Sequence, residues 1–245
     1  MGLRLDSRVD ESVSTAYLRA EAREAMEISG AYTTERAAAL SGVPKSTAYY
    51  WARKGHLLPS VSQKPLLWSY TDLLALRTIY WLRQPKSAFE RDVPPTSMPK
   101  VRRALHQLRD LDLDLFAEGR PTLAVTLAGE IVINAEAMPP QLVDGQYLER
   151  KLVDILGPFE GLEGTKGPDL LWPRPTVQIL PGKISGAPHI SGTRVPTQSI
   201  YALADRGFSL DQLAKIYPFV SRDSLAESID LETQLQRNAA LTRAA

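Results

Sequence analysis

The stretch between positions 157 and 181 is rich in glycine and proline, and it constrains the possible folds more than any other feature of the sequence. Glycine is favoured in irregular conformations and proline lacks a backbone N–H, so neither a helix nor a strand is expected to run through it. We therefore expect a linker over residues 157–180 between two folded parts, and a chain of 245 residues is long enough for two cores. The residues concerned are Gly157, Pro158, Gly161, Gly164, Gly167, Pro168, Pro173, Pro175 and Pro181.

Charge is distributed very unevenly along the chain. Residues 30–109 contain 13 basic and 4 acidic residues, a net charge of +9, although the whole chain carries only +1. A basic block of domain size attracts polyanions, so nucleic acid is the expected partner. The segment 110–169 is acidic and has two interpretations, a mimic of nucleic acid that binds a basic partner or a solvated hairpin with a flexible linker.

The composition also excludes several classes of protein. The chain has no cysteine, so disulfides, thiolate metal sites and thiol nucleophiles are excluded. It has no signal-peptide pattern and no run of roughly 20 apolar residues for a membrane span, which predicts a cytoplasmic protein. His56, His106 and His189 lie far apart in sequence and belong to no metal or triad motif. We therefore expect no enzyme, no cofactor and no bound metal.

Apolar periodicity predicts a mainly α fold with a small β-hairpin. The helix 99–110 would place Val101, Leu105 and Leu108 on one face, and the alternating pattern of 123–133 predicts a hairpin with its turn at Ala128-Gly129. The expected parts are an N-terminal helical arm (1–29), a winged helix-turn-helix domain (30–110), the hairpin in an acidic connecting region (111–156), the linker (157–180) and a C-terminal trihelical, helix-turn-helix-like domain (181–245).

The second helix of the basic block has the pattern of a recognition helix. Lys45, Tyr49 and Arg53 recur every four residues and share one face, while Trp51 faces the core. Such a helix fits the major groove of DNA, with Lys64 in the following loop placed to reach phosphates. Two amphipathic helices joined by a glycine turn also occur in helical cores, and it is the charge of +9 that favours DNA binding.

The residues from Tyr32 to Arg83 resemble the N-terminal domain of the MerR family of transcription regulators. The resemblance implies a supporting helix at 34–40, a recognition helix at 45–54 and a wing at 58–70. Two arginines of the family are replaced here by Tyr49 and Trp68, and we expect Trp68 in the core. The matching residues are Tyr32, Thr33, Ala37, Gly42, Ser46, Thr47, Tyr50, Arg53, Gly55, Leu57, Pro59, Tyr70, Asp72, Leu76 and Ile79. The expected DNA-binding residues are Lys45, Ser46, Thr47, Tyr49, Tyr50, Arg53, Lys54 and Lys64.

The segment from Pro181 to Pro196 contains three glycines and ends in Gly-Thr-Arg-Val-Pro. It lacks the Gly-Lys-Ser or Gly-Lys-Thr of a nucleotide-binding loop, and a tight structural turn is the alternative. A helix is expected at 198–206, and Ser209 with Gln212 has the spacing of a capping box. Ser221 can cap a last helix.

This C-terminal segment, with Ile200, Gly207, Leu213, Tyr217-Pro218 and Leu225, resembles the uncharacterised domain family numbered 433. The resemblance implies a small trihelical antitoxin domain, and with a DNA-binding domain the whole chain resembles a VapB-type antitoxin. Such a protein would bind a VapC-type PIN-domain ribonuclease toxin and repress its own operon as a homodimer. The arginines expected to pair with toxin carboxylates are Arg194, Arg222 and Arg237. The alternative is a stand-alone MerR-like regulator that responds to a ligand or a protein effector.

Overall fold

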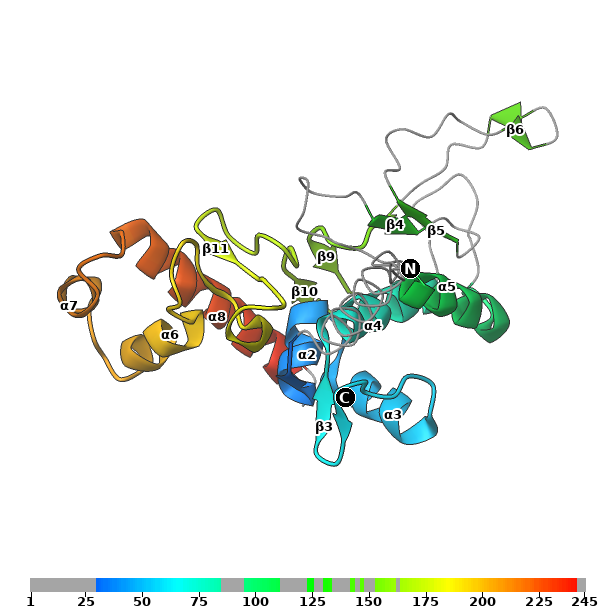
Figure 1. The fold of residues 1–245 in the computed structure, drawn as a ribbon, viewed down its shortest axis with the longest axis horizontal. Coiled ribbons are helices and arrows are strands. Elements are labelled where there is room, and N and C mark those ends of the chain that lie inside the picture. Colours follow the sequence, from blue (N-terminus) through cyan, green and yellow to red (C-terminus); the bar gives the residue numbers. More distant parts are fainter. Residues whose placement is uncertain are drawn as a thin grey trace, which may run out of the picture.

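The computed structural model describes residues 30–84, 95–110, 123–125, 130–133, 142–143, 146–147, 153–161 and 164–241 (Figure 1). The expected N-terminal arm, the turn at Ala128-Gly129 and most of the connecting region 111–156 lie outside these residues. The described part is predominantly helical with short antiparallel strands, which confirms the predicted fold class. None of the described helices is both long and apolar enough to cross a membrane.

The basic block begins with two short helices and a hairpin. A three-stranded sheet in the order β1-β3-β2 joins the start of the block to the hairpin. Thr33 caps the first helix, Gly42 ends it at φ 71°, and Ser69 and Asp72 form a capping box on the helix after the hairpin. The elements are β1 (Tyr32–Thr33), α2 (Thr34–Ser41), α3 (Lys45–Lys54), β2 (Ser62–Gln63), β3 (Leu66–Trp68) and α4 (Tyr70–Arg83).

The middle of the chain adds one helix and a set of short strands to this block. The pairing of β4 with β5 confirms the predicted hairpin, and β4 also pairs with β8. Val101, Leu105 and Leu108 are buried on the predicted face of α5. The elements are α5 (Met98–Asp110), β4 (Leu123–Val125), β5 (Ile131–Ile133), β6 (Leu142–Val143), β7 (Gln146–Tyr147), β8 (Val153–Asp154), β9 (Phe159–Glu160) and β10 (Lys166–Gly167).

The predicted linker 157–180 is a packed segment, and this expectation was wrong. Leu170, Leu171, Val177 and Ile179 are buried in the same core as the helices of the basic block. Glycine and proline do prevent long regular elements here, but apolar residues between them still bury their side chains, which stabilises an irregular segment as it does a helix.

Arg77 of α4 holds this segment against the basic block. Its guanidinium is fully buried and donates hydrogen bonds to backbone carbonyl groups from both parts. Burial lowers the pKa of Arg77 to about 10, so the side chain stays charged at neutral pH. The acceptors, at 2.6–3.1 Å, are the carbonyl oxygens of Leu40, Ser41, Ile155, Gly157 and Pro168.

The C-terminal part is trihelical, as predicted, with a small core of its own. Ser209 and Gln212 form the predicted capping box, and the Ser221 hydroxyl accepts a hydrogen bond from the Ser224 amide at 3.1 Å at the start of the last helix. Before the first helix, Thr197 donates its amide to the Pro188 carbonyl at 3.0 Å, so the segment 181–196 forms a structural turn. The elements are β11 (Val177–Gln178), the 3₁₀ helix η2 (Ile184–Gly186), β12 (His189–Ile190), α6 (Thr197–Asp205), α7 (Leu210–Ile216) and α8 (Arg222–Leu241).

Helix α8 connects the C-terminal part to the basic block. It runs from α6 and α7 at one end of the molecule to α2, with α3 and α5 beyond (Figure 1). Leu231 and Leu235 of α8 belong to the core of the basic block, and Asn238 donates a hydrogen bond to the Ala39 carbonyl at 2.9 Å. Helix α8 therefore packs against both the C-terminal part and the basic block.

Candidate nucleic-acid interface

Helix α3 is anchored on one side and exposed on the other. Ala48, Trp51 and Ala52 are buried and α3 packs against α2, which confirms that Trp51 belongs to the core. Trp68 is fully buried as well, and its indole N–H donates a hydrogen bond to the Thr34 hydroxyl at 3.0 Å. The apolar face thus fixes the helix and leaves its polar face to solvent.

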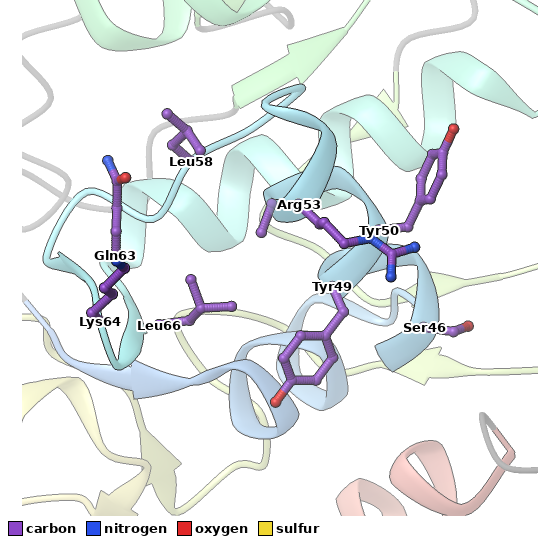
Figure 2. Close-up of a pocket in the computed structure, with 9 residues that line it drawn as sticks. Ser46, Tyr49, Tyr50, Arg53, Leu58, Gln63, Lys64 and Leu66 are labelled. Carbon is purple, nitrogen blue, oxygen red and sulfur yellow. The ribbon is translucent and has the colours of Figure 1, made fainter.

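An open groove of about 520 Å³ lies between the exposed face of α3 and the hairpin β2–β3 (Figure 2). The helix contributes polar and aromatic side chains to one wall, and the loop and hairpin contribute the other. Tyr49 and Tyr50 are 39% and 45% exposed, so solvent can reach both side chains. The lining residues are Ser46, Tyr49, Tyr50, Ala52, Arg53, Leu58, Gln63, Lys64 and Leu66.

The groove brings together five of the eight residues expected to bind DNA. Ser46, Tyr49, Tyr50 and Arg53 extend from α3, and Lys64 lies across from them at the tip of the hairpin (Figure 2). Arg53 and Lys64 therefore belong to opposite walls of one groove, which also carries the hydroxyl groups of the other three side chains. A polyanion with donor and acceptor groups matches this combination of charge and hydrogen-bonding partners.

Lys45, Thr47 and Lys54 do not line the groove. Lys54 is exposed at the end of α3, and Thr47 is half-buried. Lys45 forms an ion pair with Glu35 of α2, with 2.6 Å between Nζ and Oε1. The Lys45 hydrogen bond holds the pKa of Glu35 below its ordinary value, so this carboxylate is charged at neutral pH.

The accessible positive charge is smaller than the sequence count of +9 suggests. Arg77 is buried, and Arg36 pairs with the buried Glu232 of α8. The pairing of Lys45 with Glu35 does not lower the count further, because Glu35 is already included in it. These pairings join residues on different helices, so nothing in the local sequence pattern indicated them.

The structure does not bring the three arginines expected to bind a toxin into one cluster. Arg194 is exposed in the turn before α6, while Arg222 and Arg237 are exposed on α8. The last two are 15 residues apart, which corresponds to roughly 22 Å along a helix. Arg222 also pairs with Asp211 of α7, so its charge is already partly compensated.

Large apolar side chains are exposed at the end of the molecule formed by α6 and α7. Phe219, between α7 and α8, is 68% exposed and has an edge-on contact with Tyr217. Ile216 and Phe208 are 47% and 38% exposed. Among the described residues, no group of three or more histidine, aspartate or glutamate side chains is arranged to hold a metal ion.

Residues 177–230 match the model of a family described as a protein of unknown function (DUF433). The match covers β11, the structural turn, α6, α7 and the first part of α8, and it agrees with the resemblance seen in the C-terminal sequence. No curated protein and no solved structure matches the chain.

Proposed function

We propose that this protein is a cytoplasmic DNA-binding regulator that inserts α3 into the major groove of duplex DNA. The observation that carries the proposal is the groove between α3 and the hairpin, which is lined by Arg53 on α3, Lys64 on the hairpin and three side chains with hydroxyl groups. Duplex DNA presents phosphates on both sides of each groove, so a helix with an adjacent basic hairpin can contact base edges and backbone together.

The MerR-like sequence pattern from Tyr32 to Arg83 supports the same function. In this proposal Ser46 and Tyr50 approach base edges, while Arg53 and Lys64 bind phosphates. As a homodimer the protein would place two copies of α3 in successive major grooves, about 34 Å apart.

The test is the affinity for a labelled duplex at several salt concentrations. Arg53→Gln and Lys64→Gln should each weaken binding about tenfold and reduce the slope of log K against log salt by about one, because each variant removes one phosphate contact. Lys215→Gln on α7 is the control, since it removes one exposed positive charge at the other end of the molecule. Equal effects of all three variants would mean that the interface is elsewhere.

The exposed apolar residues around α7 favour a second role, in which the C-terminal part binds a protein. Isolated apolar side chains are common on surfaces, but Ile216 and Phe219 lie close together in sequence, within the residues that match a domain family. Together with the resemblance to VapB-type antitoxins, this supports binding of a PIN-domain toxin, with Arg194 and Arg237 available for its acidic residues.

Co-expression with the product of the neighbouring reading frame tests the antitoxin role. A stable complex and relief of growth arrest are the expected results, and Phe219→Ser should weaken the complex without changing DNA affinity. If no complex forms and the parent still binds DNA, the chain is a stand-alone MerR-like regulator and the antitoxin proposal is wrong.

A further inference from the structure

Two donors of α3 meet a single oxygen atom of α2. Lys45 Nζ lies 2.6 Å from Glu35 Oε1, and the Tyr49 hydroxyl donates a hydrogen bond to the same oxygen at 3.1 Å. The donors are one helical turn apart, and Nζ lies 5.7 Å from the centre of the Tyr49 ring, so each helps to position the other.

We propose that Lys45 and Tyr49 form a binding site for one DNA phosphate, and that Glu35 occupies this site in the free protein as an internal competitor. This inference rests on the DNA-binding function proposed above. A phosphate oxygen and a carboxylate oxygen accept the same charge-assisted hydrogen bonds, so a phosphate oxygen can take the place of Oε1 with both donors retained.

The geometry makes the exchange feasible. The side chains of Lys45 and Glu35 are 32% and 45% exposed, so water and a phosphate can both reach them. Exposed ion pairs contribute little net stability, which means that displacing Glu35 requires little energy. Tyr49 also lines the groove between α3 and the hairpin, so the site is continuous with the surface that faces DNA.

The competitor is expected to be effective at neutral pH. Because the hydrogen bond from Lys45 lowers the pKa of Glu35, the carboxylate stays ionised and continues to accept hydrogen bonds from Lys45 and Tyr49. Glu35 would therefore limit the affinity for DNA of any sequence, since a phosphate contact carries no sequence information. A bound phosphate would also be repelled by the displaced carboxylate nearby, which lowers the affinity further.

The experiment measures binding of the full chain to a fluorescent random-sequence duplex of about 30 base pairs between about 50 and 200 mM NaCl. Glu35→Gln should bind at least about threefold more tightly than the parent, with a salt slope steeper by about one, because Lys45 becomes available to a phosphate. Asp205→Asn on α6 is the matched control, because it makes the same change in net charge on an exposed residue at the far end of the molecule (Figure 1). Adding Lys45→Gln to Glu35→Gln should remove the gain.

The outcomes distinguish a failure of this inference about Glu35 from a failure of the proposed DNA-binding function. If the parent binds the duplex and Glu35→Gln binds no more tightly than Asp205→Asn, Glu35 is not a competitor although the DNA-binding function stands. The same conclusion follows if the gain persists in the double variant, because the gain would then not depend on Lys45. If neither the parent nor Glu35→Gln binds the duplex, both the DNA-binding function and this inference are wrong.

Discussion

Arg36 and Glu232 lie 196 positions apart and form a two-point ion pair, with Nη1–Oε2 and Nη2–Oε1 distances of 2.5 and 2.7 Å. The pair joins α2, which packs against α3, to α8 of the C-terminal part. Glu232 is buried and also accepts a hydrogen bond from the Thr197 hydroxyl at the start of α6. One carboxylate thus ties together three helices from both halves of the chain.

Breaking this pair should be strongly destabilising. Arg36→Met leaves the buried carboxylate without its cation, and we expect the free energy of unfolding to fall by about 3 kcal/mol. Arg222→Met is the control, because it breaks the ion pair with Asp211, in which both side chains are mostly exposed, and should change stability by less than about 1 kcal/mol. Urea denaturation of both variants measures the difference. Similar losses would show that the pair with Glu232 is no more than a surface contact.

Gly42 and Gly55 provide a test of how the helix-turn-helix is packed. Both have a positive φ, 71° and 69°, so a side chain is strained at either position. A Cβ at Gly42 would also lie 2.7 Å from the Gly167 backbone nitrogen, whereas a Cβ at Gly55 meets nothing within 4 Å. Gly55→Ala should therefore lower the free energy of unfolding by about 1 kcal/mol, and Gly42→Ala by about 3 kcal/mol or more.

Thermal and urea unfolding of these two variants report on the segment 157–180. If it packs against the turn of the helix-turn-helix, Gly42→Ala is the more damaging change. The strain from φ is nearly the same at both glycines. If the two variants lose the same free energy of unfolding, the segment 157–180 does not pack against Gly42 and is a linker.

His189 should make the stability depend on pH. The residue is buried in β12, and burial lowers the pKa of its imidazole, so the folded protein binds this proton less readily than the unfolded chain. The contribution of His189 to the free energy of unfolding is fully present above the pKa of the unfolded chain, near 6.5. It is lost as the pH falls through the lower pKa of His189 in the folded protein.

The loss of stability between about pH 7 and pH 5 should thus be smaller in His189→Asn than in the parent. Asparagine can still donate to the Ala187 carbonyl, which lies 2.9 Å from His189 Nδ1, but it does not titrate. Urea denaturation at both pH values measures the effect, with His56→Asn as the control for loss of an exposed imidazole. If stability falls by the same amount between the two pH values in His189→Asn and in the parent, His189 is protonated equally in the folded and unfolded states.

Local features of the chain were predictable from the sequence. Caps, turns and apolar periodicity depend on residues within a few positions of each other, and so the helices, the hairpin β4–β5 and the Ser209–Gln212 capping box were predicted correctly. The burial of Trp51 and Trp68 was also predicted, because proteins that bind duplex DNA seldom need exposed indole rings.

Contacts between distant residues were not predictable in this way. The segment 157–180 was expected to be a linker because its glycines and prolines exclude regular structure, but they do not exclude packing of the leucines between them. Arg77 counts toward the charge of +9 in the sequence, although its buried guanidinium binds carbonyl groups of distant segments. The pairing of Glu35 with Lys45 depends on how α2 and α3 cross, which the spacing of ten residues does not reveal.

The most direct test of the central claim is photocrosslinking to DNA. The photoreactive residue p-benzoylphenylalanine would replace Tyr50, which is exposed in the groove, or Phe208, which is exposed at the other end of the molecule. After irradiation with a labelled duplex, the Tyr50 variant should form a covalent adduct with DNA and the Phe208 variant should not. An adduct at position 208 with none at position 50 would contradict the assignment of α3 as the helix that enters the major groove.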